Sequence, residues 1–412
     1  MVYQSPTGAR DLLPLDVVQK RWIEERLQQV FHRWGYHRII TSTLERLDTL
    51  MAGGAIARST VLQIQEADDD LGLRPELTAS IARAAVTRMA GATFPLRLYY
   101  NANVFRRSHV NSPSGQQEYY QAGVELLGMG GTLADAEVLL LVVDCLASMG
   151  LQGASLLLGE AGLTRSLLSV FPEAIRENVR RAIAQLDRIA LETLPLSAEL
   201  RDRALFLFEL RGKPADVLQK VASLDLNAEQ QTAVANLKSL VDVLEQQLAS
   251  SNEPMFVPTV TLDLSLIQTI NYYTGLVFEV VAPSSSGLAV VATGGRYDQL
   301  LGLYHPQGQS YPGIGFALQI EPLHQVLLDT GRLPQQTPVS DWLVVAESEQ
   351  AYGAAIAYAR TLRSAPHPVR VELDLGRRSP VEIQDYAQHR RIARIAWVKA
   401  AGDVVIESVN SP

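Results

Sequence analysis

The sequence predicts an α+β fold, in which an antiparallel sheet flanked by helices carries a helical insertion and is followed by a small α/β domain. Helical and strand-like segments alternate as far as about residue 159. Almost purely helix-forming sequence then runs from about residue 163 to residue 250. Strand-like, β-branched sequence resumes at Val257. We therefore interpret the helical stretch as an insertion within a domain of residues 1–330.

The elements of this first domain follow from hydrophobic periodicity. Apolar residues one helical turn apart predict a first helix at residues 16–34, which Gly35 ends. Residues His37 to Thr43 then predict a strand. The most apolar run surrounds Cys145 and contains Asp144, and it is shorter than the roughly 20 residues of a membrane span. It predicts a buried helix.

The last part of the chain predicts a separate small α/β domain at residues 341–412. Residues 331–340, GRLPQQTPVS, have the composition of a linker. Helices expected at 348–362 and 379–390 then alternate with the strand-like segments WLVVAE, VRVELD, IARIAWVK and VVIESV. Arg390, Arg391 and Arg394 form a basic cluster, which we interpret as a solvated helix end.

Composition limits the possible partners. The chain has 412 residues, of which 47% are hydrophobic and 19% charged, and its net charge is −8. This acidic balance does not favour long-range capture of tRNA or another polyanion. The single cysteine excludes an internal disulfide and a cysteine-rich metal site, which fits a reducing cytoplasm. The first residues lack a basic start followed by an apolar stretch, so we expect neither secretion nor a membrane partner.

Four separated segments have the character of motifs, and the last three contain the candidate functional residues: PTGARDLLP with GYHRIITSTLE, LRPELTASIARA, FRRSHVNSPSGQQEYYQAGVELLG, and NYYTGLVF with GGRYDQL downstream. In order and spacing they resemble the catalytic domain of histidyl-tRNA synthetases over roughly the first 330 residues. The resemblance implies a class II aminoacyl-tRNA synthetase fold and a dimer formed through the first segment. Ser42 replaces a proline of that segment, so the dimer face is expected to differ. The C-terminal domain would be a shortened anticodon-binding domain.

The resemblance further implies a pocket for L-histidine. Its α-amino group would contact Glu76, Thr78 and Gln121, its imidazole would contact Glu125 and Tyr273, and Tyr272 would line the pocket. Arg106 is the best candidate for the carboxylate of the ligand. An ammonium group favours a carboxylate and neutral acceptors, and an imidazole needs partners at both ring nitrogens. The competing interpretation is structural, because paired tyrosines and spaced polar residues are also ordinary features of a strand.

The cations that would bind a nucleotide are replaced in three motifs. Gln268 and Thr269 stand where the family has Arg-Gly before the tyrosines. The second-motif loop keeps only His109, with Ser114 and Gln116 in place of arginines. The third motif has Gln319 for its glycine and Pro322 for its arginine. Because guanidinium groups stabilise charge developing on a phosphate, we predict no amino-acid activation, no catalytic residues, no cofactor and no metal.

A pocket for an amino acid without the nucleotide machinery resembles the family of ATP phosphoribosyltransferase regulatory subunits. That resemblance implies a hetero-octamer with the short-form catalytic subunit, in the first step of L-histidine biosynthesis, with feedback inhibition by histidine. Two alternatives remain: an active histidyl-tRNA synthetase, and a synthetase-like scaffold that binds no amino acid. The GGRYD segment is interpreted first as a tight turn with an ion pair between Arg296 and Asp298.

Overall fold

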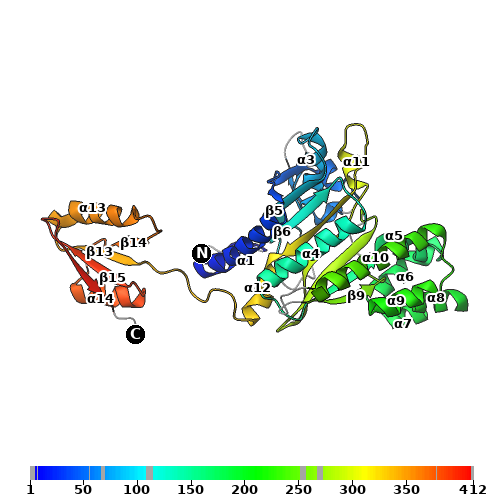
Figure 1. Ribbon diagram of the computed structural model, residues 1–412. Coiled ribbons are helices and arrows are strands. Elements are labelled where there is room, and N and C mark those ends of the chain that lie inside the picture. The colour runs from blue at the N-terminus through cyan, green and yellow to red at the C-terminus, as the bar shows by residue number, and fades with distance from the viewer. Residues whose placement is uncertain are drawn as a thin grey trace. The chain divides into compact units, whose positions relative to one another are not determined.

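The computed structural model describes residues 5–6, 8–54, 56–65, 70–107, 115–250, 257–266, 272–376 and 378–409. The chain divides into two compact units, residues 1–334 and 335–412 (Figure 1). Each unit has its own sheet and its own hydrophobic core.

A nine-stranded sheet forms the centre of the first unit. The neighbouring strands from β5 to β7 are antiparallel, whereas β1 runs parallel to β5 and β9 runs parallel to β7. The predicted antiparallel sheet is therefore confirmed for its central strands, and the outer strands add two parallel pairs. In sheet order the strands are β1 (His37–Arg38), β5 (Leu96–Phe105), β6 (Glu118–Leu127), β12 (Gly313–Gln319), β11 (Gly287–Arg296), β10 (Leu276–Ser284), β7 (Ser155–Glu160), β9 (Thr259–Asp263) and β8 (Arg211–Gly212).

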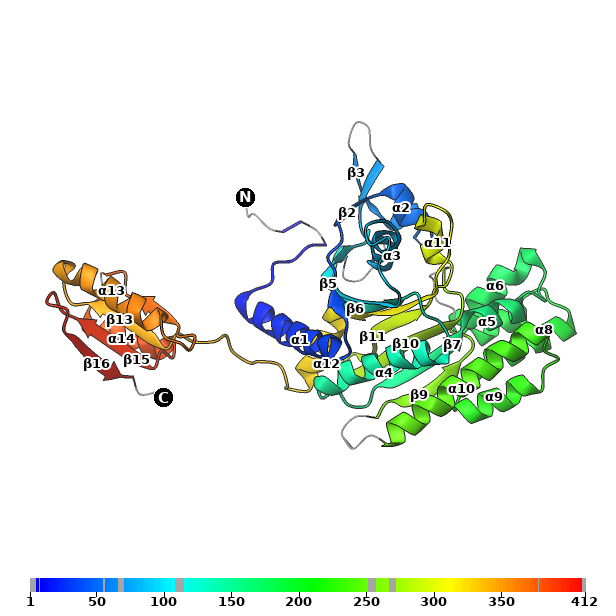
Figure 2. The same cartoon turned by 45° about the horizontal axis from the view of Figure 1, so that its top comes forward.

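Three helices cover one face of this sheet: α1 (Pro14–Arg33), α4 (Thr132–Ser148) and α12 (Ile320–Asp329) (Figure 2). Helix α4 contains the apolar run around Cys145, which is fully buried, so the predicted buried helix is confirmed. Asp144 interrupts this run on the exposed side of the helix, where its carboxylate accepts a hydrogen bond from the Trp34 indole at 2.9 Å. No helix within the described ranges is both long and apolar enough to cross a bilayer.

The opposite face of the sheet is covered less completely. Helices α3 (Thr78–Thr87) and α11 (Leu300–Tyr304) pack there around a second hydrophobic cluster. A three-stranded antiparallel sheet, in the order β2 (Leu44–Arg46), β4 (Asp70–Leu73) and β3 (Leu62–Gln65), contacts α2 (Leu47–Met51) and precedes α3 in the chain. A short 3-10 helix, η1, spans Arg58–Thr60. This incomplete cover leaves room for a cavity.

The predicted helical stretch is present as six helices among the described residues: α5 (Ala161–Leu168), α6 (Glu173–Ala184), α7 (Arg188–Thr193), α8 (Ala198–Phe208), α9 (Pro214–Ala222) and α10 (Ala228–Ser250). Figure 1 shows them in green, gathered at one end of the large sheet. The structure adds the two-residue strand β8, which the sequence did not predict and which pairs with β9. Helix α10 packs against α4 and α5, so the insertion shares the main core.

The second unit is a four-stranded sheet with one helix on each face, as the sequence predicted for a small α/β unit. Its strands in sheet order are β14 (Val371–Leu373), β13 (Trp342–Ala346), β15 (Arg394–Val398) and β16 (Val404–Ser408). Helix α13 (Tyr352–Arg363) follows the 3-10 turn η2 (Glu349–Ala351), and α14 (Pro380–His389) begins with a capping box between Ser379 and Glu382.

Two predicted strands are wrong in extent. Strand β1 ends at Arg38 rather than Thr43, and the following Ile40 is 79% exposed. The strand-like sequence that resumes at Val257 is not one continuous strand, because β9 ends at Asp263 and β10 begins at Leu276. The Asp263 carboxylate accepts hydrogen bonds from the backbone N–H and the hydroxyl of Ser265, a side-chain turn that ends β9.

Candidate functional site

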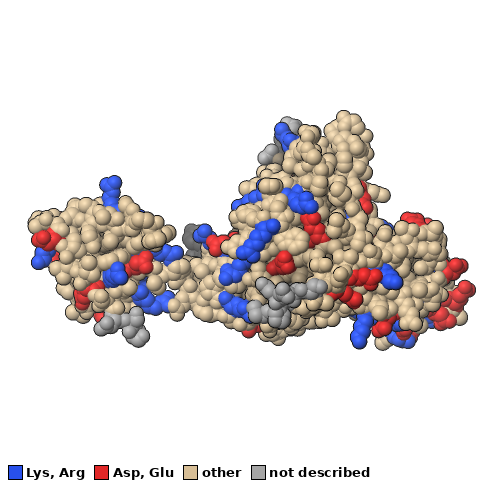
Figure 3. Space-filling model, in the orientation of Figure 1, with Lys and Arg blue, Asp and Glu red and all other residues tan. Residues whose placement is uncertain are grey.

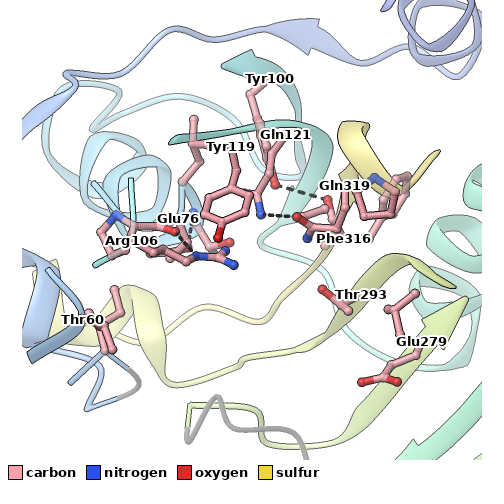
Figure 4. A pocket seen from close by; sticks show the side chains of 18 of the residues that line it. Thr60, Glu76, Tyr100, Arg106, Tyr119, Gln121, Glu279, Thr293, Phe316 and Gln319 are labelled. Atoms are coloured by element: carbon pink, nitrogen blue, oxygen red, sulfur yellow. Dashed lines mark hydrogen bonds between the residues drawn. The ribbon is translucent and has the colours of Figure 1, made fainter. Parts of the chain in front are cut away.

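A cavity of about 1030 Å³ lies on the less covered face of the large sheet (Figure 4). Its floor includes Glu279, Thr293, Ala317 and Tyr100, which share one face because direct cross-strand pairing links them through Gly123. This volume lies at the upper end of the range typical of small-molecule sites, roughly 300–1,000 Å³.

Small residues in the floor make room for the cavity. Gly315 pairs directly with Glu125 in the neighbouring strand β6. A Cβ atom at Gly315 would lie 1.9 Å from the Oε2 atom of Glu125 and 2.3 Å from the backbone oxygen of Val124. The absence of a side chain at Gly315 therefore permits the Glu125 carboxylate to lie flat across strand β12.

Glu125 is a buried carboxyl group at the base of the cavity, with a residue exposure of 1%. The Thr78 hydroxyl donates to its Oε1 atom at 2.7 Å, and the Tyr297 hydroxyl donates to its Oε2 atom. Burial raises the pKa of Glu125 to about 8, although both of these hydrogen bonds act in the opposite direction. Glu125 does not itself line the cavity, whereas Thr78, Tyr297 and Gly315, which surround it, do.

Three tyrosines form one wall of the cavity. The ring of Tyr272 lies 5.1 Å from that of Tyr273 and 5.7 Å from that of Tyr297, both edge to face. Tyr273 is fixed from behind, because the Arg165 guanidinium donates to its backbone oxygen at 2.8 Å. Both predicted tyrosines thus line the cavity, but they precede strand β10 rather than belonging to a strand.

Glu76 lies at the start of helix α3, where its two carboxylate oxygens accept hydrogen bonds from the backbone N–H groups of Thr78 at 2.6 Å and Ala79 at 3.0 Å. Burial raises the pKa of Glu76, and these two backbone bonds act in the opposite direction. Glu76 therefore stabilises the N-terminus of α3 as well as lining the cavity. Each carboxylate oxygen has a second lone pair that an ammonium group could use.

Arg106 lies beside Glu76 at the same side of the cavity (Figure 4). Its Nε atom donates to the backbone oxygen of Pro75 at 2.9 Å, which fixes the direction of the guanidinium. Its backbone N–H donates to the oxygen of Gln117 at 2.8 Å. Two guanidinium nitrogens remain beyond the Nε contact, the geometry that suits a carboxylate.

Gln121 and Gln319 form a side-chain pair across strands β6 and β12. Gln121 is 2% exposed, and its Nε2 atom donates to the Oε1 atom of Gln319 at 3.0 Å (Figure 4). The structure thus brings together all seven predicted histidine-binding residues: Glu76, Thr78, Arg106, Gln121, Tyr272 and Tyr273 line the cavity, and Glu125 lies at its base.

Of the residues at which the three nucleotide-binding motifs were compared, Gln116, Gln319 and Pro322 line the cavity. Gln268, Thr269, His109 and Ser114 lie outside the described residues. Among the described residues that line the cavity, Arg106 is the one lysine or arginine, whereas Glu76, Glu279 and Glu321 supply carboxylates. Burial raises the pKa of Glu279 and of Glu321. The described lining therefore offers little positive charge to a triphosphate.

The GGRYD segment is not the predicted tight turn, because Gly294, Gly295 and Arg296 belong to strand β11. The expected ion pair is present, since the Arg296 guanidinium lies 3.1 Å from Asp298. Arg296 also lies 2.5 Å from Asp135 at the start of α4, a contact that the sequence did not predict. Its backbone oxygen accepts from the N–H of Thr274, directly after the tyrosine pair. Tyr297, which this network holds against Glu125, is the site residue that sequence reasoning missed.

The C-terminal arginine cluster makes ordinary surface contacts. Arg390 lies 3.5 Å from Glu372, and Arg394 lies over the ring of Trp342 at 5.0 Å. On the face shown in Figure 3, Lys and Arg side chains are interspersed with Asp and Glu side chains. Arg390 follows the last residue of helix α14, which agrees with a solvated helix end. The interpretation is wrong for Arg394, which is the first residue of strand β15.

Comparisons with known proteins agree with the resemblance seen in the sequence. The family described as histidyl-tRNA synthetase matches residues 8–323. Proteins named ATP phosphoribosyltransferase regulatory subunit are 64% identical in Nostoc sp. strain PCC 7120, over 411 residues, and 59% identical in Gloeothece citriformis, over 414 residues, with 100% of each chain covered.

Solved structures show the same fold. A Bacillus halodurans protein described as an ATP phosphoribosyltransferase regulatory subunit/histidyl-tRNA synthetase is 27% identical, with a TM-score of 0.79, and the match covers 97% of this chain and 99% of that one. Histidyl-tRNA synthetase from Nostoc sp. PCC 7120 is 18% identical, with a TM-score of 0.77 and coverage of 99% and 97%. The second match shows the fold alone. This chain therefore belongs to the family of ATP phosphoribosyltransferase regulatory subunits, which share the class II fold of histidyl-tRNA synthetases.

Proposed function

We propose that this chain is the non-catalytic regulatory subunit of a cytoplasmic ATP phosphoribosyltransferase, which serves the first step of L-histidine biosynthesis. The names of its full-length relatives support this role. The partner would be a short-form catalytic subunit that supplies the phosphoribosyl-transfer site. This chain would self-associate as a dimer, assemble with that partner into a hetero-octamer, and be required for its activity.

L-Histidine is the proposed ligand of the cavity. The single observation that carries this proposal is the buried Glu125 carboxyl group, held by the Thr78 and Tyr297 hydroxyls beside three tyrosine rings. Glu125 and Tyr273 would bind the imidazole, and Tyr272 would form a wall of the pocket. The Thr78 hydroxyl uses its proton on Glu125 and keeps lone pairs, so it can accept from the α-ammonium group together with Glu76 and Gln121. Arg106 would bind the carboxylate.

The absence of catalysis in this chain is supported by the charge of the cavity. Adenylate formation requires cations that stabilise charge developing on the α-phosphate. The described lining supplies Arg106 alone, and the proposed role of that residue is with the amino acid. Loss of one preorganised donor of this kind costs on the order of 3 kcal/mol of transition-state stabilisation, so the loss of several would reduce adenylation to insignificance.

Feedback inhibition would operate by linkage. L-Histidine would bind one arrangement of the complex more tightly than another and so shift the population toward the inhibited arrangement. The shift is limited by the difference in affinity between the two arrangements. A ligand-binding residue can therefore be required for inhibition without being required for activation.

Reconstitution with a short-form catalytic subunit tests this function. We expect the two chains to co-purify, and phosphoribosyl transfer to require this chain and to fall when L-histidine is added. The Glu125→Gln variant, which keeps the size of the side chain, is expected to preserve activation and weaken the response to L-histidine. Absence of co-purification, or activity that is independent of this chain, would overturn the proposal.

Two further measurements distinguish the alternatives. Histidine-dependent exchange of pyrophosphate into ATP by the purified chain would identify an active synthetase, whereas we expect none. L-Histidine at about one hundred times its dissociation constant should stabilise the chain by roughly 2.7 kcal/mol. A thermal midpoint that does not respond to L-histidine would favour a scaffold that binds no amino acid.

A further inference from the structure

Gln319 occupies an unusual position for a cavity residue. It is the last residue of strand β12 and the N-cap of helix α12, where a polar side chain commonly accepts from the first free N–H groups of the helix. The Gln319 side chain makes no such capping bond. Instead its Oε1 atom accepts from the Nε2 atom of Gln121 at 3.0 Å.

The register of the sheet explains this contact. Gln319 and Gln121 are direct cross-strand partners, so their side chains leave the same face of neighbouring strands. In the synthetase motif that the sequence resembles, glycine stands at the position of Gln319 and has no side chain to make this contact. The pair is therefore a feature that this chain adds to the floor of the cavity.

The contact satisfies the donor end of the Gln121 amide and leaves its acceptor end for a ligand. A glutamine amide has a donor end and an acceptor end, and the two are nearly identical in shape. When Nε2 donates to Gln319, Oε1 is the end left for a ligand. With the reverse orientation, the amide would present N–H groups to an α-ammonium group, which has no acceptor.

We propose that Gln319 is a positioning residue: its Oε1 atom satisfies the buried Gln121 N–H group when the Gln121 oxygen faces the ligand, and the cavity thereby favours ligands that carry a free α-ammonium group. This inference rests on the proposed function, because it requires L-histidine in the cavity. Gln319 acts through Gln121 and need not touch the ligand. The same arrangement discriminates against imidazole ligands without an amino group, which leave the buried Gln121 oxygen without a donor.

Calorimetric titration of the full chain tests the inference with two ligands. L-Histidine carries the α-ammonium group, and 3-(imidazol-4-yl)propionate lacks it. The Gln319→Met variant keeps the length of the side chain but cannot accept from Gln121. We expect it to bind L-histidine about tenfold more weakly, while its affinity for the propionate stays within about twofold. Gln319→Glu keeps the acceptor and is expected to bind L-histidine at least as well as the wild type.

A matched control lies outside the cavity. Gln28 is an exposed glutamine of helix α1 that does not line the cavity, so Gln28→Met is expected to leave both affinities unchanged. If Gln319→Met does not fold, Gln319→Ala removes the same contact with a smaller side chain, and the same ratio of affinities applies to it.

The outcomes separate this inference from the function on which it rests. A wild-type chain that binds no L-histidine overturns both. A wild-type chain that binds L-histidine, with Gln319→Met equally strong, overturns the positioning role alone. The same conclusion follows if Gln319→Met weakens both ligands equally, because that pattern indicates a general loss of structure rather than a loss of selection at the amino group.

Discussion

The two faces of the large sheet carry opposite kinds of side chain, although the same strands form both. In strand β6, Ala122, Val124 and Leu126 belong to the main hydrophobic core beneath α4. Gln121, Gly123 and Glu125 alternate with them and face the cavity side of the strand. Gln121 lines the cavity, Gly123 pairs with its floor residue Ala317, and Glu125 lies at its base. Because successive side chains of a strand point to opposite faces, residues that stabilise the core alternate with residues at the cavity.

Strand β12 repeats the pattern. Ile314 and Leu318 are buried in the main core, whereas Gly315, Ala317 and Gln319 line the cavity. Phe316 belongs to that core and also contributes to the cavity lining. Small side chains on the cavity face create the open volume, and polar ones supply its contacts. The face beneath α4 is packed with apolar side chains. The cavity face contains the buried carboxyl group of Glu125, and an apolar side chain in its place would cost less free energy to bury.

The largest expected effect concerns the α4 face. Leu139 in α4 is fully buried within the main core, so Leu139→Ala removes buried methyl groups and leaves a void. We expect the free energy of unfolding to fall by about 2–5 kcal/mol. The dissociation constant for L-histidine should remain unchanged in the folded fraction. Denaturant unfolding and calorimetric titration below the unfolding midpoint measure the two quantities.

Leu139→Met is the control, because a swap that conserves volume should lose less than about 1.5 kcal/mol. If Leu139→Ala weakened L-histidine binding as strongly as a cavity variant does, the two faces would be coupled, and their separation in the structure would not describe the energetics.

The second effect is a pH dependence that arises from Glu125. Its pKa is raised to about 8 in the folded state from an ordinary value of 4.5. Between these values the unfolded chain ionises while the folded protein keeps the proton, so rising pH removes stability. We expect the difference in free energy of unfolding, wild type minus Glu125→Gln, to fall by about 2–4 kcal/mol from pH 4.5 to pH 8 and to level off above.

The Tyr297→Phe variant tests whether this pH dependence comes from Glu125. The Tyr297 hydroxyl donates to Glu125 and lowers its pKa, so removing it should extend the pH-dependent limb to higher pH. Thr87→Ser, on the exposed part of α3, should leave the profile unchanged. A difference curve that stays flat from pH 4.5 to pH 8 would show that Glu125 ionises normally in the folded protein.

Hydrophobic periodicity correctly predicted the helices and strands that have a clear apolar pattern in their own sequence. Helix α4 is apolar almost all round, and the C-terminal unit alternates clear strands with helices, so both were predicted correctly. Strand β8 has two residues and depends on its pairing with β9, so no local sequence pattern predicts it. The break between β9 and β10 depends on the side-chain turn at Asp263, which overrides a β-branched composition.

The candidate site followed from motif order more than from periodicity. The seven predicted residues lie in three of the four motif segments, and the structure gathers all of them at one cavity. The bond from Tyr297 to Glu125 joins residues 172 positions apart. It depends on cross-strand register, which a single sequence does not display. The signal available in the sequence was the GGRYD motif itself, which contains Tyr297.

The smallest of these effects concerns Gly315, where the cavity face requires the absence of a side chain. In Gly315→Ala the added Cβ would meet the Glu125 carboxylate at 1.9 Å and the Val124 backbone oxygen at 2.3 Å. Strands β6 and β12 must separate locally or Glu125 must move, and we expect a loss of about 1–3 kcal/mol in the free energy of unfolding. Because Glu125 is displaced, the thermal stabilisation by L-histidine should disappear.

Gly353→Ala is expected to raise the free energy of unfolding, whereas Gly315→Ala lowers it. Gly353 lies within helix α13 of the second unit with nothing within 4 Å of an added Cβ, so this change should stabilise that helix by roughly 0.5–1 kcal/mol. Its effect on L-histidine binding should be nil, since it lies in the other compact unit. Unchanged ligand stabilisation in Gly315→Ala would show that Glu125 can leave its position without loss of recognition, and the buried carboxyl group would then belong to the fold rather than to the site.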